Sequence, residues 1–110
     1  MEISAIKDGG AVVMTLKGRM DATTSPKFME DFKEWTKQKE FIYVIDLTDL
    51  EYLSSAGLRS FLAAAKDVKP FKGKLVFCGL QNMVTQVFEM SGFASMFKVV
   101  PTLTDAMRSI

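Results

Sequence analysis

The chain has 110 residues, of which 48% are hydrophobic and 25% are charged, and its formal net charge is +1. This composition is typical of a single globular domain over residues 1–110 and excludes an intrinsically disordered chain. The small net charge gives no indication of direct binding to nucleic acid or to an anionic membrane.

Two strands and a helix are predicted in the first part of the chain. Residues 3–6 and the apolar residues 11–16 flank an Asp-Gly-Gly sequence at 8–10, which predicts a hairpin. Thr24 or Ser25, followed by proline, is typical of the start of a helix. The helix that follows is amphipathic, and its apolar positions are Phe28, Phe32 and Trp35.

Next, residues 41–45 form a segment that is apolar on both faces, and the chain then continues from Asp46 to Leu53 before the second helix. Such a segment is typical of a central strand of a parallel sheet. A second helix is predicted from Ser55, and its inner stripe is Leu58, Phe61, Leu62, Ala65 and Val68.

The last third of the chain alternates strands with helices in the same way. Residues 74–78 form a short apolar strand, Asn82 can cap a third helix, and Gly92 can end it. A short strand near residues 97–100 precedes a terminal helix that begins after Thr102. We therefore predict an α/β fold with a mixed, mostly parallel sheet of four to five strands and about four helices.

The segment 90–97 is apolar but is predicted to be a loop. It can pack over the end of the third helix, which is the interpretation that we favour. It can also form an adaptable contact patch on the surface.

Residue counts restrict the chemistry that the chain can perform. Histidine is absent and Cys78 is the only cysteine, which excludes Cys/His zinc sites, an internal disulfide and histidine-dependent catalysis. We expect a protein that is not an enzyme and uses no cofactor or metal. The chain shows no secretion signal and no apolar run that could span a bilayer, so we expect it to be cytoplasmic, without membrane insertion.

Two predicted loops carry polar residues at the carboxyl ends of strands, which is the binding side of an open α/β sheet. One loop holds Ser54, Ser55 and Gly57, and the other holds Asp21 and Thr23. If their strands are neighbours, the loops converge. Capping alone could explain the serines, and turn formation could explain the other loop. A phosphate on a hydroxyl at this helix start would use the same physics, since it would meet free N–H groups and the positive end of the helix dipole.

Two further carboxylates follow the apolar segment of residues 41–45: Asp46 is predicted to end that strand, and Asp49 to lie in the turn after it. They could suggest a metal site, but no third ligand is evident. We expect them to be solvated loop residues.

The chain resembles the STAS-domain family, the bacterial anti-sigma factor antagonists, over nearly its whole length. The resemblance rests on LKGRMDATTSPKF, on YVIDLTDLEYLSSAGLRSFL and on the C-terminal segment from GKLVFCGL to TDAM. It implies a non-enzymatic switch that binds an anti-sigma factor, often itself a serine kinase, and so frees a sigma factor. The kinase phosphorylates a serine at the start of the second helix, which breaks the complex, and a phosphatase restores it.

When residues 54–58 are aligned with the family motif Asp-Ser-(Ser/Thr)-Gly-Leu, the phosphorylated serine of the motif corresponds to Ser55. Ser54 stands in place of the motif's aspartate and Ala56 in place of its second hydroxyl residue. The resemblance implies a partner-binding surface formed by Asp21, Thr23, Ser54, Ala56, Gly57 and Arg59. The missing aspartate motivates the alternative of a non-phosphorylated STAS adaptor or a subunit of a larger complex, such as a lipid-transport system.

Overall fold

The computed structural model describes residues 1–110, and its first two strands form the predicted hairpin. β1 (Glu2–Asp8) pairs antiparallel with β2 (Ala11–Met20). Gly9 and Gly10 at the turn have φ angles of 57° and 94°, which glycine adopts without the steric cost of a Cβ. The hairpin places β1 at one edge of the sheet.

The rest of the main sheet is parallel, in the order β1-β2-β3-β5-β6. Its other strands are β3 (Ile42–Asp46), β5 (Lys74–Cys78) and the edge strand β6 (Lys98–Val100). β3 lies between β2 and β5, and its residues Tyr43, Val44 and Ile45 are fully buried. Cover on both faces explains why this strand shows no polar alternation.

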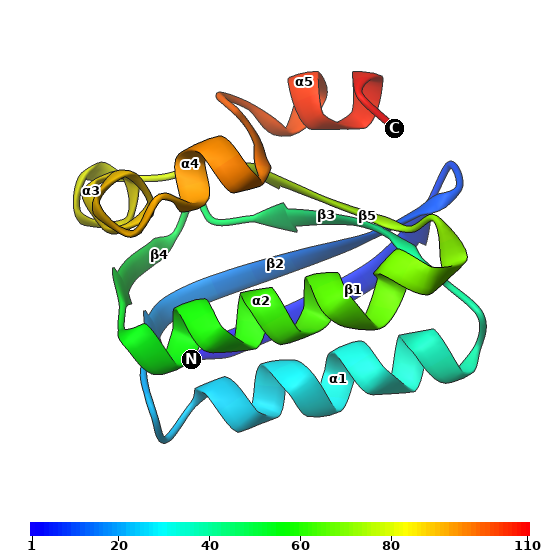
Figure 1. Cartoon of the computed structure of the whole chain (residues 1–110), viewed down its shortest axis with the longest axis horizontal. Coiled ribbons are helices and arrows are strands. Elements are labelled where there is room, and N and C mark those ends of the chain that lie inside the picture. The colour runs from blue at the N-terminus through cyan, green and yellow to red at the C-terminus, as the bar shows by residue number, and fades with distance from the viewer.

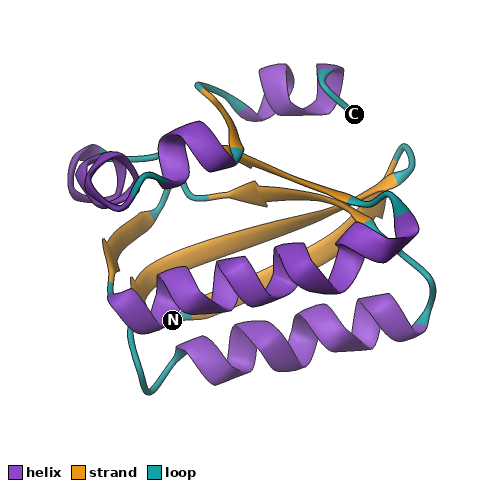
Figure 2. Ribbon diagram, viewed as in Figure 1, coloured by secondary structure: helices purple, strands orange, loops and turns teal.

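Helices cover both faces of the sheet (Figures 1 and 2). α1 (Ser25–Lys37) and α2 (Ser55–Val68) lie side by side on one face, and α5 (Leu103–Arg108) lies on the opposite face. Phe28 of α1 meets Phe61 of α2 edge to face, with ring centroids 5.3 Å apart. This aromatic contact joins the two helices over the larger core cluster of 19 buried residues.

The predicted fold class is confirmed, but the sheet has six strands and the chain has five α-helices. β3 ends at Asp46, as predicted, but after the turn the chain forms a further strand, β4 (Leu50–Leu53), which was not predicted. Oδ1 of Asp46 accepts hydrogen bonds from the backbone N–H and the hydroxyl of Thr48, at 3.0 and 2.7 Å. An aspartate that bonds two residues ahead in this way closes a turn and ends the strand.

β2 has two neighbours on this side: its residues Val12–Thr15 pair with β3, and its C-terminal residues Gly18–Met20 pair with β4. The register shifts between Gly18 and Arg19, and Gly18 has a φ of 95°. This bulge bends β2 toward β4.

The C-terminal half contains a 3₁₀ turn (Lys69–Phe71), α3 (Asn82–Ser91) and α4 (Phe93–Met96). The expected cap at Asn82 was wrong by one residue, because Gln81 occupies the cap position and Asn82 is already helical. Gly92, with a φ of 83°, ends α3 as predicted. None of the helices combines the length and hydrophobicity that crossing a bilayer requires.

The segment 90–97, predicted as a loop, contains the short helix α4. Phe93 is 9% exposed and belongs to the core, whereas Met90 and Met96 are 88% and 59% exposed. Part of the segment therefore packs over the end of α3, as favoured, and its two methionines remain on the surface.

Candidate functional site

The loop after β2 is ordered by Asp21. Its Oδ1 accepts hydrogen bonds from the hydroxyl and the backbone N–H of Thr23, at 2.7 and 3.0 Å, and from the backbone N–H of Thr24 at 3.1 Å. The bond from the Thr23 hydroxyl is the main reason why the pKa of Asp21 lies below its usual value. Asp21 and Thr23 therefore form the turn that simple residue preferences indicate, and Thr23 is left exposed on it.

Thr24 precedes α1 but does not cap it with its side chain. Its hydroxyl instead donates to the carbonyl of Arg19 at 2.9 Å and accepts from the backbone N–H of Asp21 at 2.8 Å. Ser25 supplies a second tie, because its hydroxyl and backbone N–H both donate to the carbonyl of Asp21, at 2.6 and 2.9 Å. Hydrogen bonds from Thr24 and Ser25 thus tie the start of α1 to Arg19 and Asp21, at the end of β2.

At the start of α2 the two serines have different roles. Ser54 is the cap residue, in an extended conformation, and its Oγ accepts from the backbone N–H of Gly57 at 3.3 Å. Ser55 is the first helical residue; it is exposed, and its hydroxyl makes no hydrogen bond within the chain. The cap needs only Ser54, so the hydroxyl of Ser55 is free for another use.

The expected convergence of the two loops is confirmed through β4. Met20 and Leu53, the last residues of β2 and β4, are partners in the parallel pair. The backbone N–H of Ser54 also donates to the carbonyl of Met20 at 2.9 Å. Asp21 and Ser54, the next residues along each strand, therefore begin from neighbouring positions at one end of the domain.

Gly57 was expected on the partner-binding surface, but it is buried on the inner side of α2. A Cβ at this position would lie 2.5 Å from Cδ1 of Leu53 and 3.1 Å from Cγ of Met20. The absent side chain therefore lets α2 approach the strand ends closely. Gly57 therefore has a packing role in this domain.

A shallow hollow of about 360 Å³ lies between the N-terminal halves of α1 and α2. Two of its lining residues, Ala56 and Arg59, are in the predicted set. The others were not predicted as site residues, and they are Ala22, Ser25, Pro26, Met29, Ser60 and Ala63. They meet only because α1 and α2 pack in parallel, and together they form a mostly small, uncharged surface with one cation.

Arg19 also lies close to this end of the domain without having been singled out from the sequence. Its guanidinium carbon is 4.1 Å from the centre of the Tyr52 ring, a cation–π contact across the β2–β4 pair. Arg19 and Tyr52 become neighbours because of the bulge at Gly18, which a linear pattern does not reveal.

The remaining polar candidates have structural roles. Asp46 serves the turn before β4, and Asp49 is exposed. No three carboxylate or thiol groups lie close enough together to hold a metal ion. Cys78 is fully buried, and burial, with a smaller contribution from the charge of Asp46, raises the pKa of its thiol to about 12.

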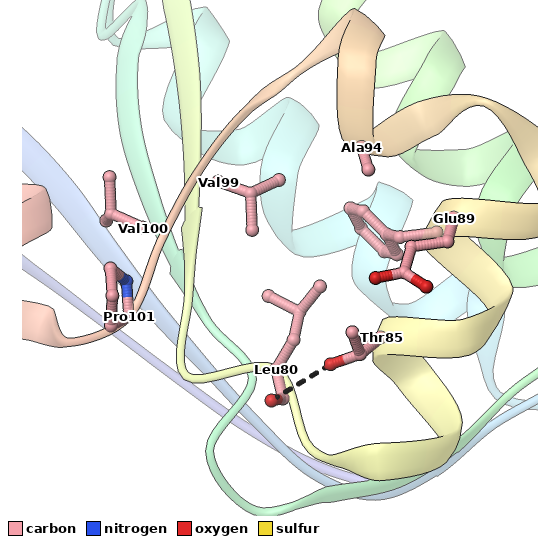
Figure 3. Close-up of a pocket in the computed structure, with 8 residues that line it drawn as sticks. Leu80, Thr85, Glu89, Ala94, Val99, Val100 and Pro101 are labelled. Atoms are coloured by element: carbon pink, nitrogen blue, oxygen red, sulfur yellow. Dashed lines mark hydrogen bonds between the residues drawn. The ribbon is translucent and has the colours of Figure 1, made fainter.

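A second hollow, of about 380 Å³, lies between α3, α4 and β6 (Figure 3). Most of its lining is apolar, including Leu80, Val99 and Val100. The hydroxyl of Thr85 donates to the carbonyl of Leu80 at 3.2 Å, and Glu89 is the only charged residue in the lining. This hollow shares no lining residue with the hollow between α1 and α2.

Comparison with known proteins finds matches over almost the whole chain. The sequence model of the STAS domain matches residues 2–106. The anti-sigma factor antagonist BtrV of Bordetella bronchiseptica is 35% identical over 99 residues, which cover 90% of this chain and 85% of that protein.

Among solved structures, the fold is similar to that of an anti-sigma factor antagonist from Mycobacterium paratuberculosis. That match has a TM-score of 0.90 and 22% identity, and covers 99% of this chain and 92% of that one. The Bacillus cell fate determinant SpoIIAA in its phosphorylated form matches with a TM-score of 0.77 and 15% identity, covering 98% of each chain.

Proposed function

The chain belongs to the STAS-domain family, among the anti-sigma factor antagonists, and on this premise we propose that it binds an anti-sigma factor in the cytoplasm and thereby releases a sigma factor for transcription. We further propose that phosphorylation of Ser55 by a serine kinase ends this binding and that a serine phosphatase restores it. The protein itself would act as a switch and not as an enzyme.

The observation that carries the proposal is the free hydroxyl of Ser55 on an exposed helix start. The cap of α2 is already formed by Ser54, so a modification of Ser55 leaves the cap hydrogen bond in place. The neighbouring hollow presents Ala22 and Ala56, which a partner can cover without desolvating a carboxylate. Thr23, in the loop after β2, is also exposed at this end of the domain.

The switching reaction transfers the γ-phosphoryl group of ATP to Oγ of Ser55. The hydroxyl proton goes to a base of the kinase, and ADP leaves; the phosphatase later uses water to release inorganic phosphate. This chain contributes only the acceptor and its position. The new group adds about −1.5 to −2 charges to a face that is mostly uncharged.

Two features next to Ser55 would hold that phosphate. The backbone N–H groups at the start of α2 and the helix dipole favour an anion at this position. Arg59 lies four residues further along α2, on the same side of the helix as Ser55, and makes no salt bridge. A phosphate on Ser55 would pair with Arg59 and so remove this cation from the partner-binding surface, in addition to repelling or desolvating the partner.

Ser54 stands where the family motif has an aspartate. In this chain the position serves as a helix cap, a role that serine and aspartate fill about equally well. The substitution removes a negative charge beside the acceptor, so the kinase of this chain would recognise the surface without it.

Binding measurements on two Ser55 variants test the proposal. The partner is the anti-sigma factor kinase encoded nearest to this chain in its genome, and affinity is measured by isothermal titration calorimetry. Ser55→Ala should bind within about twofold of the wild type, whereas Ser55→Asp should bind at least about tenfold more weakly. Ser4→Asp, which puts the same charge on the exposed edge strand β1, is the matched control and should bind normally. Equal affinities for the alanine and aspartate variants at Ser55 would contradict the charge switch.

Incubation with the same kinase and ATP tests the modification itself. A phosphopeptide that contains Ser55 should appear for the wild type and disappear for Ser55→Ala. If an active kinase leaves Ser55 unmodified, the alternative applies, and the chain is a non-phosphorylated STAS adaptor or a subunit of a larger complex such as a lipid-transport system.

A further inference from the structure

A groove of about 410 Å³ runs between the second half of α2, the start of β5 and the start of β6. We call it the lysine groove and define it by its lining residues Leu62, Lys66, Lys69, Lys74, Met96 and Lys98. It shares no lining residue with the hollow beside Ser55. Ser55 and Lys66 are eleven residues apart on α2, which corresponds to about 16 Å along the helix.

The floor of the groove is apolar. Leu62 and Phe97 are half-buried and pack against the main core, and Met96 projects from α4 with 59% of its surface exposed. Methionine is a flexible and polarisable side chain that adapts to different apolar partners. The floor therefore offers apolar surface that the domain itself does not cover.

The rim of the groove is positively charged on two opposite sides. Lys66 and Lys69 belong to α2 and the turn after it, and Lys74 and Lys98 belong to strands. All four are exposed, none forms a salt bridge, and no carboxylate lines the groove.

This local charge is unusual for the molecule. The whole chain carries a formal net charge of only +1. Elsewhere its lysines are often paired; for example, Lys27 contacts Asp31 at 2.9 Å and Lys37 contacts Glu34 at 3.2 Å. Four unneutralised lysines around an apolar floor favour an occupant that is both apolar and acidic.

We propose that the lysine groove is a second docking site, which binds an acidic amphipathic segment of a partner protein. Its apolar side would lie on the floor between α2 and α4, and its carboxylates would meet the lysines on both rims, in the manner of a helix bound in a groove. The groove is open to solvent, so a small ligand would remain largely exposed in it, whereas a bilayer would need a protruding surface rather than a concave one.

Binding in the lysine groove is independent of the Ser55 switch, because the two surfaces lie at different ends of α2 and share no lining residue. A partner could therefore hold this domain while Ser55 is modified and demodified. The proposal goes beyond the antagonist function and does not require it.

Fluorescence anisotropy with a designed probe tests the groove. The probe is a labelled peptide of about 16 residues with leucines at helical i, i+3, i+4, i+7 spacing and glutamates on both flanks; a second peptide replaces every glutamate by lysine. The wild type should bind the acidic probe, more weakly as salt is raised, and should not bind the basic one.

Charge reversal on both rims should abolish most of this binding. Lys66→Glu/Lys98→Glu should bind the acidic probe at least about tenfold more weakly than the wild type. The matched control Lys33→Glu/Arg108→Glu changes the net charge equally at two exposed, unpaired cations outside the groove, and should bind within about twofold of the wild type. Met96→Gln should also weaken binding, since it removes apolar contact and keeps every charge.

Several results would overturn the proposal. These are no binding of the acidic probe by the wild type, equal weakening in the groove variant and its control, or an unchanged affinity for Met96→Gln. Sedimentation with vesicles of phosphatidylcholine and phosphatidylglycerol covers the lipid case: binding to vesicles that is lost in the groove variant, without peptide binding, would assign the groove to a membrane surface. Ser55→Asp should bind the probe as the wild type does, so that a failure of the Ser55 switch and a failure of the groove remain distinguishable.

Discussion

The backbone N–H of Ser54 donates to the carbonyl of Met20 over 2.9 Å, and this hydrogen bond joins the loop before α2 to the end of β2. Leu53, the residue before Ser54, is also the strand partner of Met20. The position of Ser55 relative to the Asp21 turn is therefore determined by β4, a strand of only four residues. Substitutions in and beside this region test which contacts hold Ser55 and the Asp21 turn in place.

Ser54→Ala should destabilise the domain, because it leaves the backbone N–H of Gly57 without its cap acceptor. We expect a loss of about 1 kcal/mol in the free energy of unfolding, measured by urea denaturation. Ser55→Ala is the control and should change this free energy by less than about 0.5 kcal/mol, since the Ser55 hydroxyl makes no hydrogen bond within the chain. Equal effects of the two substitutions would contradict the different roles assigned to these serines.

Gly57→Ala should lower the free energy of unfolding by about 1–2 kcal/mol, because the added Cβ would crowd the buried side chains of Leu53 and Met20. Helix propensity alone predicts the opposite, a gain of about 1 kcal/mol for replacing a helical glycine. The sign of the change in urea denaturation therefore decides between packing and propensity. A stabilised variant would show that the side chains of Leu53 and Met20, or α2 itself, can shift to admit the added Cβ at little cost.

Asp21→Asn should destabilise the domain at neutral pH by an amount that vanishes in acid. Hydrogen bonds, first that from the Thr23 hydroxyl, lower the pKa of Asp21 in the folded state below the value of 3.8 expected when unfolded. The stabilisation is thus fully present above the unfolded pKa and is lost as pH falls through the folded pKa. Asparagine keeps an oxygen acceptor but not the charge.

The urea midpoints of the wild type and Asp21→Asn, measured from about pH 7 to about pH 2.5, should therefore converge at the acid end. A difference that is constant over this range would assign the effect to the shape of the turn and not to the ionised carboxylate.

Ser55→Asp should stabilise α2 slightly, because a negative charge at the first helical residue meets the helix dipole and Arg59 four residues away. We expect a gain of about 0.5 kcal/mol, part of which is lost when Arg59→Gln is added. A double-mutant cycle in urea denaturation measures the coupling between positions 55 and 59. A coupling of zero would remove Arg59 from the mechanism proposed for the phosphate.

The sequence was informative wherever a few adjacent residues determine the backbone. The Asp-Gly-Gly turn, the start of α2 after Ser54, and the end of α3 at Gly92 were all predicted and are confirmed. Each depends on a local preference: positive φ at glycine, or an oxygen that satisfies a free helix N–H. The central position of β3 could be predicted as well, because burial on both faces leaves a continuous apolar run.

Features that depend on contacts between distant segments could not be predicted in this way. The end of β3 at Asp46 was predicted, but β4 was missed because four residues between a turn and a helix have no strand pattern of their own. Only their pairing with β2 makes them a strand. Gly57 lies four residues before Phe61 and so shares its buried face, but the predicted stripe began at Leu58; how closely Gly57 packs against Leu53 and Met20 is shown by the tertiary structure. The lysine groove joins residues from α2, β5, α4 and β6, which have no common pattern along the chain.

The sequence by itself determined the order of the helices and strands other than β4 and α4, the fold class and the hydroxyl at the start of α2, because these follow from short-range periodicity and capping. The tertiary structure alone decided which of the candidate residues are exposed, as Ser55 is, and which face the core, as Gly57 does. It did so because the exposure of a side chain at the start of α2 depends on how that helix packs against the ends of β2 and β4. This packing results from contacts between residues that are far apart in the sequence.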